Sequence, residues 1–156
     1  MSNKSSLIIS LIVFFFAASC LISGSNILLY ALLTEPYLPA GTLITWVGMV
    51  ALPASLYFGF HFLNKPVSPI EKIFSVCIKI SMLVSALWAP ISALLSGNLS
   101  NSFTGKPQFQ GGQLAMKIFW SYSYFVVILP LGILFAIGLY SLFKRFFSHS
   151  KKTGSL

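Results

Sequence analysis

Four long apolar segments dominate the sequence, at residues 7–33, 43–63, 73–95 and 118–143. A helix needs about 20 apolar residues to cross the hydrocarbon core of a bilayer, and every segment is at least that long. None alternates polar and apolar residues in the way that marks the strands of a membrane barrel. Because backbone groups in lipid must be hydrogen-bonded internally, helices are the other spanning structure. The sequence therefore predicts an all-α fold, a four-helix membrane bundle forming a single domain over residues 1–156.

The composition excludes a soluble domain and a disordered chain. Charged residues make up 8% of the chain and hydrophobic residues 56%, whereas soluble domains carry about 25% charged residues and disorder requires low hydrophobicity. The net charge of +8 comes from Lys and Arg residues that lie mainly between the apolar segments or at the chain ends. We therefore expect no nucleic-acid partner and interpret the basic residues as signals of membrane topology.

The basic residues predict the orientation of the bundle. Seven of them lie in the N-terminus, in the connection 64–72 and in the tail 144–156, whereas the other two connections hold Lys106 and Lys117. Connections rich in Lys and Arg stay on the cytoplasmic side. We expect both termini to face the cytoplasm, in a bacterial inner membrane.

The first apolar segment also has the general shape of a signal peptide, with small residues before Cys20. The apolar stretch continues beyond Cys20 to Leu33, so we favour a retained anchor helix over processing near Cys20. The sequence Ser-Gly-Ser-Asn at 23–26 interrupts this segment. The span is therefore expected to end near there, with residues 27–33 leaving the membrane at a tilt.

Residues able to support catalysis or to bind a metal are few. The chain has no Asp, and its two acidic residues, Glu35 and Glu71, fall on opposite faces of the membrane in the predicted topology. Cys20 and Cys77 fall at different depths, too far apart for a disulfide. No phosphate-binding or metalloprotease motif is present. We therefore expect no enzymatic activity, no metal ion and no cofactor.

Small residues recur every four positions along the third segment. They are Cys77, Ser81, Ser85, Ala89, Ala93 and Gly97. Small faces allow helix backbones to approach closely in lipid. We expect this ridge to pack inside the bundle, with a contact to another subunit as the alternative.

Proline and aromatic residues mark further features of the segments. Pro53, Pro90 and Pro130 lie inside the second, third and fourth segments, where each removes a helical hydrogen bond and predicts a kink. Aromatic residues gather toward the predicted outer ends of the helices, where an interfacial belt is expected. They are Tyr30, Trp46, Trp88, Trp120, Tyr122 and Tyr124.

Lys79 lies six residues inside the third segment. A charge within a membrane helix is costly and often functional, but a Lys stem can extend so that its ammonium group reaches the lipid headgroups. We favour this snorkelling, and keep a transport or counter-ion role as the alternative.

The connection 96–117 is the long one, with 22 residues against nine in each of the other two. Long connections in compact proteins are uncommon unless they are functional or disordered. Its amide and aromatic side chains suit protein recognition. The candidate partner-binding residues are Phe103, Lys106, Gln108, Phe109 and Gln110. The alternative is a flexible connector.

Together these features predict a non-enzymatic, multi-pass inner-membrane protein that acts through protein–protein contacts. In gross plan the chain resembles the immunity proteins of pore-forming colicins, which are small, basic, four-span inner-membrane proteins with a polar segment before the last helix. The resemblance is one of architecture and assigns no site. We expect an accessory subunit or an immunity or exclusion protein, surrounded by membrane lipid, with a membrane or periplasmic protein or a second copy as partner. The alternative function is a small transporter or channel component working as an oligomer.

Overall fold

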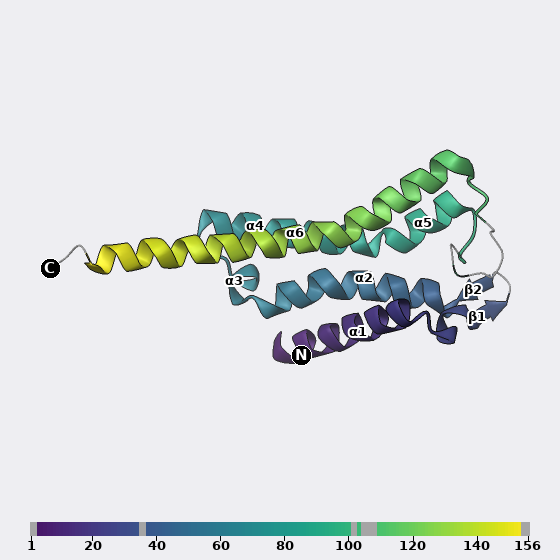
Figure 1. Ribbon diagram of the computed structural model, residues 1–156, viewed down its shortest axis with the longest axis horizontal. Helices are drawn as coiled ribbons and strands as arrows, with labels where there is room; N and C mark the ends of the chain where they lie inside the picture. The colour runs from purple at the N-terminus through teal and green to yellow at the C-terminus, as the bar shows by residue number, and fades with distance from the viewer. Residues whose placement is uncertain (1–2, 35–36, 101–102, 104–108, 154–156) are drawn as a thin grey trace.

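The computed structural model describes residues 3–34, 37–100, 103 and 109–153 (Figure 1). The elements follow in the order α1 (Asn3–Ser23), η1 (Asn26–Leu29), β1 (Ala31–Thr34), β2 (Tyr37–Pro39), α2 (Ala40–Gly59), α3 (His61–Asn64), α4 (Pro69–Ala86), α5 (Trp88–Ser96) and α6 (Gly112–Thr153).

The described helices include four stretches long and apolar enough to cross a membrane. These are α1, α2, the consecutive pair α4 and α5, and α6 as far as Lys144. Large apolar side chains remain exposed on all of them, for example Ile12, Leu83 and Phe135, which suits contact with lipid and not with water. The predicted all-α fold with four membrane-spanning helices is confirmed.

Helix α2 is central to the arrangement. It packs against α1 on one side and against α4 and α6 on the other (Figure 1). Helix α1 approaches α2 closely at Gly48, where an added Cβ atom would lie 2.5 Å from the Cβ of Ala17. This small-residue contact holds the first helix against the second, as is common between helices in lipid.

The molecule has two distinct ends. The hairpin end carries β1 and β2, the end of α5 and the start of α6, whereas the α3 end carries α3 and the start of α4 (Figure 1). The start of α1 and the C-terminal part of α6 both lie toward the α3 end. Each end has its own apolar core. At the α3 end it consists of Leu56, Leu63, Ile78, Ile133 and Ile137, and toward the hairpin end of Trp88, Phe119 and Val126.

The first helix ends where the sequence Ser-Gly-Ser-Asn begins. Gly24 has a φ of +59°, and the N–H of Ser25 donates to the carbonyl of Cys20 at 3.1 Å, which is the usual closure of a helix by a left-handed glycine. The predicted end of the span near residues 23–26 is confirmed, whereas the outer bound of 7–33 is too long, since residues 27–33 contribute to η1 and β1. Strand β1 pairs antiparallel with β2, with Leu33 opposite Leu38 and Thr34 opposite Tyr37. This hairpin was not predicted.

The other helices differ from the predicted segments mainly at their ends. Helix α4 begins earlier, at Pro69, because Ser68 and Glu71 form a capping box around its first turn. Helix α6 has 42 residues, about 63 Å at 1.5 Å per residue. It begins before residue 118 and continues to Thr153 through the segment expected to be a tail.

Candidate functional site

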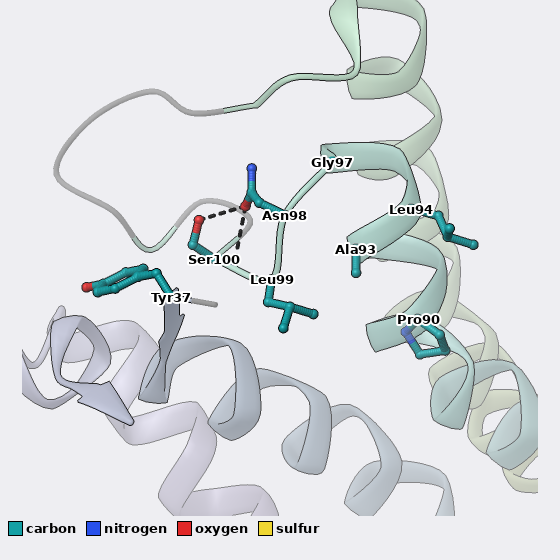
Figure 2. Close-up of a pocket in the computed structure, with 8 residues that line it drawn as sticks. All are labelled: Tyr37, Pro90, Ala93, Leu94, Gly97, Asn98, Leu99 and Ser100. Carbon is teal, nitrogen blue, oxygen red and sulfur yellow. Dashed lines mark hydrogen bonds between the residues drawn. The ribbon is translucent and has the colours of Figure 1, made fainter. Parts of the chain in front are cut away.

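An open cleft of about 630 Å³ lies at the hairpin end of the bundle (Figure 2). Its lining comes from β2, from α5 and from the turn that follows α5. The lining residues are Tyr37, Pro90, Ala93, Leu94, Gly97, Asn98, Leu99 and Ser100. In Figure 2 Tyr37 stands on one side and the α5 residues on the other, with Leu99 between them. The volume is within the range of sites that bind small molecules or side chains.

The turn after α5 is held in one shape by local hydrogen bonds. Gly97 ends the helix with a φ of +73°, and its N–H donates to the carbonyl of Ala93 at 2.9 Å. The Oδ1 of Asn98 then accepts hydrogen bonds from the N–H and the hydroxyl of Ser100, at 3.0 and 2.7 Å (Figure 2). This Asx turn fixes the backbone that forms one wall of the cleft.

The same turn is tied to the rest of the bundle on two sides. The buried hydroxyl of Thr42, in the first turn of α2, donates to the carbonyl of Leu99 at 2.9 Å. From the far side of the connection, the N–H of Gln110 donates to the carbonyl of Ser96 at 2.9 Å. The turn wall is therefore positioned relative to α2 and to the start of α6.

The opposite wall belongs to the connection between α1 and α2. The hydroxyl of Tyr37 donates to the carbonyl of Leu29 at 3.3 Å, and the N–H of Ala40 donates to the carbonyl of Tyr30 at 2.8 Å. The cleft is therefore built by two connections that are distant in sequence, each anchored to helix ends.

The lining is suited to recognition more than to catalysis. The residues that Figure 2 labels carry apolar groups, an amide, a hydroxyl and a phenol, and no carboxylate, imidazole, thiol or ammonium group. Such groups give apolar contact and hydrogen bonding, whereas acid–base chemistry near neutral pH needs groups that titrate there. In the described ranges no three His, Cys, Asp or Glu side chains could hold a metal ion. Cys20 and Cys77 are free cysteines and form no disulfide with each other.

Of the candidate partner-binding residues that the structure describes, Phe103, Phe109 and Gln110, none lines this cleft. The ring of Phe103 packs on Gly41, where an added Cβ would lie 2.6 Å from two ring carbons, and the ring of Phe109 lies 5.7 Å from that of Phe119. Both rings hold the connection on the bundle. The side chain of Gln110 is exposed beside Gly97, whereas Lys106 and Gln108 fall outside the described residues.

Sequence reasoning missed the part of the connection that forms the cleft, residues 97–100. A signal for it was available, since Gly-Asn directly after an apolar segment is typical of a helix end followed by a turn. The opposite wall had no comparable signal, because Tyr37 lies in a nine-residue connection for which no strand was predicted.

The predicted small-residue ridge is partly buried. Ser81 and Ser85 are buried, Cys77, Ala89 and Ala93 are half-buried, and Gly97 is exposed. A strict period of four drifts around a helix of 3.6 residues per turn. The face that is buried follows spacings of three and four, and it includes three serines that the prediction omitted. It consists of Ser75, Ile78, Ser81, Ser85, Trp88, Ser92 and Ser96.

The hydroxyl groups on this face differ in their partners. Ser75 donates to the carbonyl of Leu63 at 2.6 Å and so ties α4 to α3, whereas Ser85 donates to the carbonyl of Ser81 one turn earlier, at 2.8 Å. The hydroxyls of Ser81, Ser92 and, in α2, Thr45 are buried without a hydrogen-bond partner among the described atoms.

The break between α4 and α5 lies at Leu87, three residues before Pro90, where a kink was predicted. Proline has no N–H to donate to the carbonyl four residues earlier, and that carbonyl, of Ala86, accepts a hydrogen bond from the indole of Trp46 at 2.9 Å. The hydroxyl of Tyr122 donates to the carbonyl of Val84 at 2.7 Å. Side chains from α2 and α6 thus fill the break.

The predicted interfacial belt of aromatic residues is found only in part. Trp88 is 2% exposed, and its indole donates to the hydroxyl of Ser123 at 2.9 Å. Trp46 and Tyr122 are half-buried, whereas Trp120 and Tyr124 are exposed. The expectation of a belt is therefore wrong for Trp88, which belongs to the core.

The charged residues near the α3 end are arranged around Glu71. Its carboxylate accepts hydrogen bonds from the N–H groups of Val67 and Ser68 at 3.0 and 3.2 Å and lies 3.6 Å from the ammonium of Lys144. Glu71 precedes the apolar stretch that begins at Ile73. The hydrogen bonds from Val67 and Ser68, followed by the charge of Lys144, lower the pKa of this carboxyl below its ordinary value of 4.5.

Lys79 lies farther along α4 and has an exposed side chain. Its ammonium nitrogen is 5.9 Å from the centre of the Tyr57 ring, in α2.

Comparisons with known proteins add no relative. No protein-family model matches the chain, and neither a curated protein nor a solved structure matches it significantly.

Proposed function

We propose that this chain is a non-enzymatic, multi-pass protein of the bacterial inner membrane that acts by binding another protein, as an accessory subunit or an immunity or exclusion protein. The observation that carries the proposal is the cleft at the hairpin end, with its two anchored walls and its apolar lining. A site that is already ordered loses little conformational entropy when a partner binds.

The exposed groups at the cleft suit a protein partner. Leu94 is 83% exposed and Tyr37 is 38% exposed, and tyrosine is among the residues that often supply much of the binding energy at the centre of an interface. The half-buried amide of Asn98 lies beside them at the margin of the cleft.

In the proposed orientation both termini face the cytoplasm and the cleft faces the periplasm. The common direction of the start of α1 and the end of α6 supports this (Figure 1), as does the bias of basic residues toward that end. Reporter fusions at residue 1, at residue 156 and in the connection 64–72 are expected to report cytoplasm, and a fusion near Pro39 the periplasm. A periplasmic C-terminus would contradict the orientation.

Site-specific photo-crosslinking tests the binding function. A photoreactive amino acid at Tyr37 or at Leu94 is expected to crosslink to one protein in native membranes, whereas the same group at Phe135, exposed on α6, should crosslink mainly to lipid. A crosslink from Tyr37 to a second copy of the chain would identify a homo-oligomer. Equal crosslinking patterns at Tyr37 and Phe135 would contradict a cleft-specific partner.

The second candidate function is a small transporter or channel component. The buried hydroxyls without described partners, of Thr45, Ser81 and Ser92, favour it, because polar groups inside a membrane often mark pathways for ions or water. Ser92→Cys in a chain with Cys20→Ser and Cys77→Ser distinguishes the two functions. Reaction with a membrane-impermeant thiol reagent would favour transport, and no reaction is expected for the accessory protein.

A further inference from the structure

We propose that Lys79, held over the ring of Tyr57, binds the phosphate group of an anionic phospholipid in the leaflet at the α3 end. The proposal concerns the opposite end of the molecule from the cleft and is independent of the proposed function.

The position of Lys79 places a cation among lipid-facing groups. On the same side of α4, Val76 is 54% exposed and Leu83 is 61% exposed, one turn before and one turn after it. Lys79 is itself exposed. Its ammonium group is therefore surrounded by side chains that contact acyl chains, where an unpaired charge is costly.

The depth of Lys79 lies within reach of the headgroups. Its Cα lies six residues after Ile73, where the apolar stretch of α4 begins, about 9 Å along the helix axis. Side chains on a helix point toward its N-terminus, which for α4 is the α3 end. The stem of Lys79 is therefore directed toward the nearer membrane surface, where its ammonium can meet a lipid phosphate.

Tyr57 fixes the ammonium group from the neighbouring helix. The distance of 5.9 Å between the Lys79 nitrogen and the ring centre is within the range of cation–π interactions. The Tyr57 ring is itself held, since it packs against the apolar core at the α3 end and its centre lies 5.4 Å from that of the Phe58 ring. The lysine thus lies at the junction of α2 and α4 and is not a freely moving surface cation.

Charge balance favours a lipid with net negative charge over a zwitterionic one. Glu71, the acidic residue of α4, is already bonded to Lys144 and to two backbone N–H groups. The exposed residues Lys65 and Lys72 belong to the same end and add positive charge. Basic sites between membrane helices are known to select anionic headgroups in this way.

The test compares phospholipid binding by the full chain and by charge variants. Each protein is reconstituted into nanodiscs of equal parts phosphatidylcholine and phosphatidylglycerol, and the lipids that remain bound after extraction are counted by native mass spectrometry. The wild type is expected to retain phosphatidylglycerol preferentially. Lys79→Gln should reduce this preference about fivefold, as expected for the loss of one lysine near the membrane surface, and Lys79→Arg should preserve it.

Two controls make the result specific to the site. Lys65→Gln removes the same charge from the connection at this end and should reduce the preference much less than Lys79→Gln does. Tyr57→Leu leaves the cation in place and removes the ring, so it should weaken the preference for phosphatidylglycerol. It also provides a second test of the site if Lys79→Gln does not fold. Thermal unfolding in pure phosphatidylcholine nanodiscs checks folding, and should be similar for Lys79→Gln and the wild type.

Three outcomes would overturn the proposal. An unchanged preference in Lys79→Gln would show that Lys79 does not bind the lipid. An equal loss in Lys65→Gln would indicate diffuse surface charge in place of a site. Displacement of phosphatidylglycerol by inorganic phosphate alone would indicate a site for soluble anions and not for a phospholipid.

Discussion

The indole Nε1 of Trp46 donates a hydrogen bond to the carbonyl oxygen of Ala86, 2.9 Å away, at the position where Pro90 has removed the helical donor. A backbone carbonyl without a donor is costly in lipid, and here a side chain from α2 satisfies it. Because Pro90 also lines the cleft, this bond links the kink of the third membrane segment to the shape of the candidate site.

Trp46→Phe is expected to destabilise the protein by about 1 kcal/mol, since hydrogen bonds between membrane helices contribute roughly 0.6 to 1.7 kcal/mol. In a Pro90→Ala background the restored N–H can donate to Ala86, so the same substitution should be less destabilising there. Chemical unfolding in detergent of the two single variants and the double variant measures this coupling. Trp120→Phe, at an exposed tryptophan, is the control. Additive effects of the two substitutions would contradict the assigned role of Trp46.

Gly48→Val should separate α1 from α2. Its side chain would meet Ala17, which already lies 2.5 Å from the position of a Cβ on Gly48, and overpacking of this kind typically costs about 1 to 3 kcal/mol. Gly132→Val is the matched control, because Gly132 has open space around it in α6. A crosslink between engineered cysteines on α1 and α2 reports the separation. Similar stability of the two variants would mean that Gly48 does not set the helix contact.

Thr42 and Thr45, both in α2, allow a matched comparison of a hydroxyl that has a hydrogen-bond partner with one that has no described partner. Thr42→Val removes the donor to the Leu99 carbonyl and should destabilise the turn wall by about 1 kcal/mol. Thr45→Val removes a buried hydroxyl without a described partner, so stability should stay the same or rise. Hydrogen exchange of residues 97–100 should increase in Thr42→Val. Equal protection in both variants would exclude Thr42 as the support of the turn.

The stability of the α3 end should depend on pH through Glu71. The pKa of this carboxyl is lower in the folded protein than its ordinary value, so its stabilising effect is complete at neutral pH and is lost as the pH falls through the folded pKa. Thermal unfolding temperatures measured from neutral to acidic pH should therefore decrease more in the wild type than in Glu71→Gln. Lys144→Gln should change little, because its ammonium group is exposed. Parallel pH curves for the wild type and Glu71→Gln would contradict the assignment.

The sequence predicted the membrane helices well because apolar length is a strong local signal. It also predicted the interruption at 23–26 and the kink at Pro90, since glycine and proline act on the backbone next to them. The inward packing of Phe103 and Phe109 could not be predicted in this way. It depends on contacts with Gly41 and Phe119, and the sequence shows only that the two rings lie in a polar connection.

The cleft could not be predicted either, because it depends on contacts between residues far apart in the sequence. Tyr37 and Leu99 are brought to one site by pairing within the hairpin and by the bond from Thr42, and nothing in the local sequence connects the two. The buried serine face was more accessible, because the spacings among Ser75, Ser85 and Ser92 fit a helical period. Because the prediction used a strict spacing of four residues, the predicted ridge lies slightly to one side of the buried serine face.

The cleft as a binding site for a protein is the central claim, and the crosslink yield from Tyr37 in an Ala93→Phe variant tests it most directly. Ala93 lines the cleft and is half-buried, so a phenyl ring there should fill it, while Leu114→Phe, at an exposed position near the start of α6, should not. The account predicts that Ala93→Phe loses most of the crosslinked partner, that Leu114→Phe retains it, and that both proteins insert into the membrane normally. Undiminished crosslinking from Tyr37 in a correctly inserted Ala93→Phe protein would contradict it.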